Sequence, residues 1–136
     1  MIDPPSPGPP APARDGLPIA VDWRTGYLEV CLTADLDNTV AEGFRERMLE
    51  LIEDAGSGRM LIDLAHSPFV DSAGLGALVA TLKRLRLRWG NDAQMVLLHP
   101  SDEVRELFRL TQLDTYLPLF GSSGDAAERH PWIESA

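Results

Sequence analysis

The sequence predicts an α/β domain with a mixed, mostly parallel sheet. Short apolar runs that are typical of buried strands alternate with longer segments whose apolar residues recur at helical spacing. The first two runs flank a short turn, which predicts a hairpin. The predicted order is β-β-α-β-α-β-α-β-α, and single strands that alternate with helices imply right-handed crossovers and mostly parallel pairing.

The hairpin is predicted at the start of the domain. Residues 19–23 form its first strand and residues 27–33 its second, in which Leu28, Val30 and Leu32 alternate with the residues between them. Because so short a turn joins the two strands, they are expected to pair antiparallel, and this hairpin makes the sheet mixed.

The later elements follow from apolar spacing and from the residues that interrupt it. Asn38 or Thr39 is a candidate cap for the first helix, and Ser101 is a candidate cap for the third. The helices are predicted over residues 40–55, 72–89, 101–111 and 125–129, and the remaining strands over residues 60–65, 94–99 and 116–120.

The 136 residues are enough for one domain with a buried core. Residues 1–17 contain six prolines and almost no large apolar side chains, so we expect a disordered tail, a domain over residues 18–130 and a C-terminal tail over residues 131–136. A formal net charge of −9 disfavours nonspecific binding to nucleic acid or to an anionic membrane. We expect a cytoplasmic protein because Cys31 is the only cysteine and the sequence has neither signal-peptide features nor an apolar run of membrane-spanning length.

The most informative segment is Phe-Val-Asp-Ser-Ala-Gly-Leu-Gly at residues 69–76, between a predicted strand and a predicted helix. Ser72 is expected where the helix begins, beside free backbone N–H groups and the positive end of the helix dipole. Such a position suits a bound anion or a phosphate carried by the serine itself. The simplest alternative is that Ser72 only caps the helix, since serine is a favoured N-cap residue.

A catalytic or metal site has less support in the sequence. The nucleophile elbow of hydrolases requires Gly-x-Ser-x-Gly, and position 70 is Val. His66, His99 and His130 are dispersed and show no metal-ligand spacing with one another or with Cys31. We therefore expect that the protein is not an enzyme and that it binds neither a metal ion nor a cofactor.

A pair of carboxylates, Asp35 and Asp37, follows the second predicted strand. If this strand and the next are parallel, the loop of Asp35 and the turn of Ser72 lie at the same rim of the sheet, where the functional loops of α/β proteins gather. Asp71 would add a third carboxylate. Acid–base chemistry by paired carboxylates and simple capping of the loop are both open interpretations.

Three parts of the chain resemble the STAS domain family, and specifically the bacterial anti-sigma factor antagonists. Residues 34–37, Ala-Asp-Leu-Asp, are similar to the family's Gly-Glu-Leu-Asp loop. Residues 61–64 and 69–78 are similar to its strand and its Asp-Ser-x-Gly-Leu turn. Residues 104–110 are similar to its C-terminal helix.

The resemblance covers roughly residues 18–129 and implies a partner-switching regulator of transcription rather than an enzyme. In this family the unphosphorylated antagonist binds an anti-sigma factor of the GHKL serine-kinase type, which frees the sigma factor. The kinase, which binds the ATP, then phosphorylates the serine after the Asp, here Ser72, and the complex separates until a PP2C-type phosphatase removes the phosphate. The partner-binding residues that the resemblance implies are Asp35, Asp37, Asn38, Phe69, Asp71, Ser72, Ala73, Gly74 and Leu75.

Two other interpretations stay open. The chain could be a STAS scaffold or an accessory subunit of a transport or stress complex that is never phosphorylated, or, more remotely, a serine-dependent hydrolase. The sequence also departs from the family's pattern. Ala73 replaces a second hydroxyl residue, so that Ser72 is the only acceptor in the turn, and Gln112 stands where Gly often ends the third helix.

Overall fold

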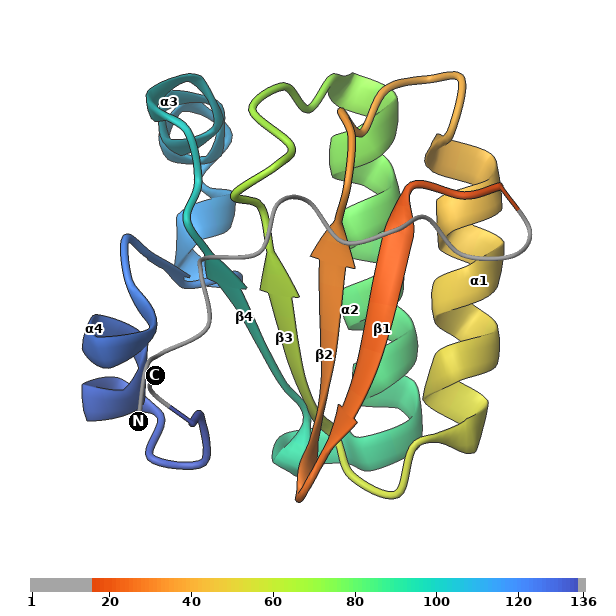
Figure 1. Cartoon of the computed structure of the whole chain (residues 1–136), viewed down its shortest axis with the longest axis vertical. Coiled ribbons are helices and arrows are strands. Elements are labelled where there is room, and N and C mark those ends of the chain that lie inside the picture. The colour runs from red at the N-terminus through yellow and green to blue at the C-terminus, as the bar shows by residue number, and fades with distance from the viewer. Residues whose placement is uncertain (1–15, 135–136) are drawn as a thin grey trace, which may run out of the picture.

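A computed structural model describes residues 16–134 and confirms the predicted order of five strands and four helices (Figure 1). Residues 1–15 and 135–136 lie outside the described residues, so the expected N-terminal tail and the end of the expected C-terminal tail are not covered by it.

The five strands form one sheet in the order β1-β2-β3-β4-β5. β1 and β2 are the antiparallel hairpin, and every later neighbour pairs in parallel, as the alternation of strands and helices predicts. The strands are β1 (Ile19–Arg24), β2 (Tyr27–Leu32), β3 (Arg59–Asp63), β4 (Gln94–Leu98) and β5 (Leu119–Phe120).

The helices are close to their predicted bounds. No helix within residues 16–134 has the length and hydrophobicity that crossing a membrane requires. The four helices are α1 (Ala41–Asp54), α2 (Ser72–Trp89), α3 (Asp102–Leu110) and α4 (Ser123–Arg129), with 3₁₀ turns at Gly90–Asp92 and Leu113–Thr115.

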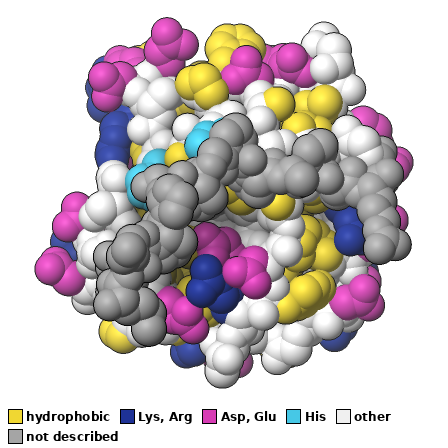
Figure 2. All heavy atoms as spheres, viewed as in Figure 1, with side chains coloured by type: hydrophobic (Ala, Val, Ile, Leu, Met, Phe, Trp, Pro, Cys, Tyr) yellow, Lys and Arg dark blue, Asp and Glu magenta, His cyan; other side chains and the backbone are white. Residues whose placement is uncertain are grey.

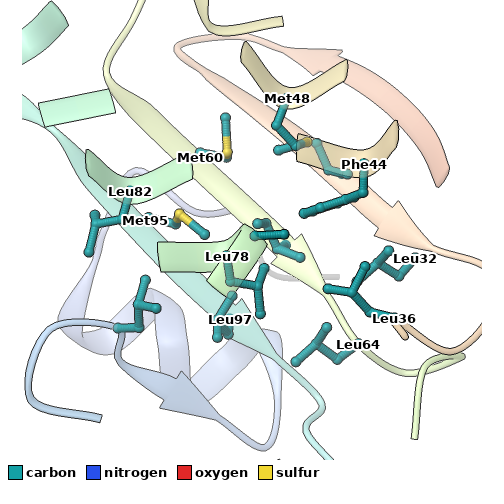
Figure 3. Packing of buried hydrophobic residues seen from close by; sticks show 14 of the residues in the cluster. Leu32, Leu36, Phe44, Met48, Met60, Leu64, Leu78, Leu82, Met95 and Leu97 are labelled. Atoms are coloured by element: carbon teal, nitrogen blue, oxygen red, sulfur yellow. The ribbon is translucent and has the colours of Figure 1, made fainter. Parts of the chain in front are cut away.

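Helices α1 and α2 cover one face of the sheet and enclose the main core (Figure 1). Phe44 of α1 and Leu78 of α2 are fully buried there, and both lie over the central strands (Figure 3). The predicted alternation in β2 is confirmed, because its apolar positions face this core. Side chains of the core that Figure 3 labels are Leu32, Leu36, Phe44, Met48, Met60, Leu64, Leu78, Leu82, Met95 and Leu97.

A second, smaller cluster lies on the opposite face of the sheet. Ile133 is buried in it beside Val96, and the indole N–H of Trp132 donates a hydrogen bond to the side-chain oxygen of Gln94 at 2.7 Å. The rings of Tyr27 and Trp132 meet edge-on, with their centroids 5.2 Å apart. Residues 131–134, which the sequence analysis assigns to the C-terminal tail, therefore pack against the sheet.

The predicted cap of α1 is wrong. Neither Asn38 nor Thr39 caps this helix with its side chain, and the residue at the cap position is Val40. Instead the carboxylate of Asp37 accepts hydrogen bonds from the amide and the hydroxyl of Thr39, while its carbonyl accepts from the amide of Ala41. Asp37 therefore closes the turn before α1 by the local bonding that is characteristic of aspartate.

The last strand is shorter than predicted. The amides of Tyr116 and Leu117 both donate to the carbonyl of Leu113, which holds these residues in the preceding 3₁₀ turn. Only residues 119 and 120 pair with the end of β4. The prediction for Ser101 is confirmed, since its hydroxyl oxygen accepts a hydrogen bond from the amide of Val104 at the start of α3.

Gln112 adopts the left-handed conformation after α3, with φ of 60° and ψ of 18°. The chain thus keeps the backbone geometry that glycine usually provides after a helix, although it has a side chain there.

We expect Gln112→Gly to stabilise the protein by about 0.5–1 kcal/mol. A left-handed residue with a Cβ costs about 1–2 kcal/mol, and the greater freedom of glycine in the unfolded chain offsets part of this gain. Urea denaturation gives the free energy of unfolding. Gln112→Ala is the control because it keeps the Cβ, and a glycine variant no more stable than the alanine variant would show that this backbone geometry carries no strain.

Candidate functional site

The parallel pairing of β2 and β3 brings two loops together at one rim of the sheet. Leu36 and Val70 form an isolated parallel bridge between these loops. The amide of Leu36 donates to the carbonyl of Phe69 at 3.0 Å, and the amide of Asp71 donates to the carbonyl of Leu36 at 3.2 Å. The expectation that the loop of Asp35 and the turn of Ser72 share a rim is therefore confirmed.

Asp71 links the two loops to α2 with its carboxylate. One oxygen accepts a hydrogen bond from the amide of Gly74 at 2.8 Å, and the other accepts from the amide of Asn38 at 2.8 Å. Asp71 is therefore the N-cap of α2, and the interpretation that Ser72 caps this helix is wrong. Both residue types are favoured N-caps, and the structure places Asp71 at the cap position, where its two oxygens accept from both amides.

Ser72 is the first residue of α2 and is exposed. Its hydroxyl forms no hydrogen bond with any residue between 16 and 134. The first turn of a helix has free backbone N–H groups and the positive end of the dipole. The hydroxyl of Ser72 is thus accessible from solvent, and its local electrostatic environment favours an anion.

The carboxylates of Asp35 and Asp37 serve the backbone of the loops. Asp35 accepts a hydrogen bond from the amide of Phe69 at 3.2 Å, a second link between the two loops. Hydrogen bonds from the hydroxyl and then the amide of Thr39 lower the pKa of Asp37, so it stays ionised at neutral pH. Of the two interpretations of this pair, the geometry supports loop capping.

Gly74 allows α2 to begin directly against the loop of Leu36. A Cβ on Gly74 would lie 2.1 Å from the carbonyl oxygen of Leu36 and 2.8 Å from its Cγ. Gly74 is therefore needed for close packing inside the molecule and does not shape the outer surface. Ala73, which is exposed, is the small residue that keeps that surface low.

The predicted partner-binding residues thus fall into three groups. Gly74 and Leu75 are buried and position the turn, while Asp37 and Asp71 are half-buried. The exposed members are Asp35, Asn38, Phe69, Ser72 and Ala73.

Helix α3, none of whose residues is among the predicted site residues, adjoins the loop that leads to Ser72. The hydroxyl of Ser101 donates to the carbonyl of Pro68 at 2.7 Å, and this bond ties the start of α3 to the loop before α2. A cavity of about 220 Å³ lies between the two and is lined by Phe69, Val70, Glu103, Val104 and Leu107. In the sequence, the one signal that points to it is a phenylalanine in a polar turn, and the structure shows that this side chain is exposed.

The other titratable groups that the sequence singles out have partners or surroundings of their own. The imidazole of His99 contacts the carboxylate of Asp63 at 2.9 Å, and His130 lies beside Gln94. Burial, with Asp63 and Glu29 nearby, raises the pKa of Cys31 to about 11, so this residue is a neutral thiol at pH 7. Within the described part of the chain, no group of three or more His, Cys, Asp or Glu side chains could hold a metal ion.

We expect Gly74→Ala to destabilise the protein by about 2–3 kcal/mol, because the new methyl group would overlap the backbone of Leu36. Gly76→Ala is a matched control two residues further along α2, where a Cβ has no atom within 4 Å. That change is expected to stabilise the protein by about 0.5–1 kcal/mol, since alanine favours a helix. Thermal and urea unfolding measure both, and equal effects of the two substitutions would contradict the close packing at Gly74.

Comparison with known proteins agrees with this architecture. The STAS domain family matches residues 19–126. The anti-sigma-B factor antagonist of Staphylococcus aureus is 31% identical over 97 residues, which make up 71% of this chain and 86% of the relative.

Solved structures share the fold. An anti-sigma factor antagonist from Mycobacterium paratuberculosis matches with a TM-score of 0.70 and 23% identity, over 88% of this chain and 97% of that one. The anti-sigma factor antagonist SpoIIAA in its unphosphorylated form matches with a TM-score of 0.63 and 19% identity, over 85% of this chain and 99% of that one. Its phosphorylated form, from Bacillus, matches with a TM-score of 0.61 and 19% identity, over 82% and 97%. With the family match over most of its length, this chain belongs to the STAS domain family.

Proposed function

We propose that this protein is an anti-sigma factor antagonist that is released from its partner by phosphorylation of Ser72. The observation that carries the proposal is the division of roles in the turn, where Asp71 caps α2 and the hydroxyl of Ser72 is exposed and unbonded among the described residues. The names of relatives support it, since the similar protein of Staphylococcus aureus is an anti-sigma-B factor antagonist.

The partner in this proposal is an anti-sigma factor of the GHKL serine-kinase type in the bacterial cytoplasm. It binds the rim formed by Asp35, Asn38, Phe69, Ser72 and Ala73, which are all exposed. The kinase supplies ATP, so the antagonist itself needs no cofactor. A PP2C-type phosphatase returns Ser72 to its free form.

Charge explains how the phosphate acts as a switch. It adds about −1.5 to −2 charges at pH 7 to a rim that already has the carboxylates of Asp35, Asp37 and Asp71. The N-terminus of α2 favours that charge by only about 0.3–1 kcal/mol, since the site is exposed. The phosphate therefore leaves the helix in place and opposes the partner by charge and by bulk. SpoIIAA has been solved in both forms, and both match this fold, which supports a phosphate that leaves the fold in place.

We expect Ser72→Ala to bind the purified GHKL-type anti-sigma factor of the same genome with wild-type affinity and to stay bound when ATP is added. Wild-type protein should gain one phosphate and dissociate. Mass spectrometry of the intact protein and binding with and without ATP measure the two effects. Ser123→Ala is a matched control, because Ser123 is likewise the first residue of a helix, α4, and this variant should be phosphorylated and released as the wild type is.

Phosphate on Ser72→Ala at the wild-type level would exclude Ser72 as the acceptor. A wild-type protein that binds the kinase but is never phosphorylated would indicate a STAS scaffold or accessory subunit instead.

We also expect the phosphorylated protein to keep its fold, since Ser72 makes no contact on which the cap of α2 depends. Its far-ultraviolet circular dichroism should match that of the free protein, and its midpoint of thermal unfolding should shift by a few degrees at most. Loss of helical signal on phosphorylation would show that the switch acts by unfolding α2 rather than by altering the interface.

A further inference from the structure

We infer that the groove between Phe69 and α3 is a second contact point for the anti-sigma factor, and that it receives an apolar side chain with a lysine or arginine next to it. This inference rests on the proposed function and extends the partner-binding rim onto α3. The groove is lined by Phe69, Val70, Glu103, Val104 and Leu107.

The walls of the groove are fixed before any partner binds. Two hydrogen bonds hold the backbone of Phe69. Its amide donates to the carboxylate of Asp35, and its carbonyl accepts from the amide of Leu36. On the other side, Ser101 caps α3 and donates to the carbonyl of Pro68. A preformed groove loses little conformational entropy when it is filled, which favours its use as a docking point.

The size and lining of the groove select the occupant. Its volume is about 220 Å³, below the roughly 300–1,000 Å³ of pockets that bind small molecules. Phe69 is 47% exposed, although Val70 and Val104 beside it are buried. An aromatic side chain that stands open beside a small apolar groove is typical of the anchor positions of protein interfaces.

The charge around the groove indicates why the occupant should have a lysine or arginine next to its apolar side chain. Glu103 lines it, and Asp102 lies next to Glu103 in the first turn of α3. Neither carboxylate forms an ion pair within residues 16–134. At the top of Figure 2, hydrophobic side chains lie between acidic ones at the end of the molecule where α2 and α3 begin.

The basic side chains of α3 do not neutralise this wall. Arg109 pairs with Glu106, and the guanidinium of Arg105 lies toward Gly121. Among the described residues, no Lys or Arg lines the apolar groove, and its border is acidic. A partner segment that combines an apolar side chain with a basic one matches both features.

The test uses the full chain and the purified GHKL-type anti-sigma factor of the same genome without ATP, so that binding is measured before any phosphate transfer. Phe69→Ala and Leu107→Ala are expected to weaken binding about tenfold or more. Leu110→Ala is the matched control, because Leu110 is on the same helix, is 67% exposed and does not line the groove. The affinity of this variant for the anti-sigma factor should stay within about twofold of the wild type.

The charge is tested separately. Glu103→Lys should weaken binding more than Glu106→Lys, and the difference should shrink as salt is raised. Glu103 is exposed, so this variant is expected to fold, and circular dichroism checks each variant.

The outcomes separate the two proposals. Wild-type affinity in both Leu107→Ala and Glu103→Lys, whose residues lie outside the rim of the proposed function, would overturn the groove and leave the proposed function standing. Absence of wild-type binding would overturn the proposed function, and the groove inference with it. Loss of binding in the groove variants with the Leu110→Ala control intact is the expected result.

Discussion

The carboxylate of Asp71 is the interaction on which the rest of the site depends. It accepts hydrogen bonds from the amide of Gly74 inside α2 and from the amide of Asn38 in the neighbouring loop. One side chain therefore fixes both the start of a helix and the spacing of two loops. The backbone bridge between Leu36 and Val70 joins the same two loops. Because hydrogen bonds to a charged group contribute about 1.5–3 kcal/mol each, this small set of bonds can hold the rim in one geometry.

Close packing also restricts which residue can stand at position 74. The carbonyl of Leu36 accepts a hydrogen bond from the amide of Asp71, and it occupies the space that a side chain at position 74 would need. Ser101 likewise makes two links with one side chain, because its hydroxyl accepts a hydrogen bond from the amide of Val104 and donates one to the carbonyl of Pro68. The rim therefore consists of loops joined to one another by their own backbones, with helices α2 and α3 each anchored to them by one polar side chain.

Much of this architecture could be predicted from the sequence. Strand and helix periodicity identifies all nine elements, because burial on one face dictates the spacing of apolar residues. The two misassigned helix caps are residues whose surroundings are decided across loops. Asn38 looks like a cap but donates its amide to Asp71, which is 33 positions away, and Ser72 looks like a cap next to a stronger acceptor. The groove on α3 also escapes prediction, because its two walls are far apart in the chain and meet only through the fold.

The separation of Asp71 from Ser72 has a consequence for how this fold can diverge. The residue that caps the helix and the residue with the exposed hydroxyl are neighbours in the chain, yet no side-chain hydrogen bond joins them in the described structure. Position 72 can therefore change without loss of the scaffold, whereas position 71 cannot. A lineage can lose the hydroxyl at position 72 and keep a stable domain, so that versions of the same surface with and without this hydroxyl differ by a single codon.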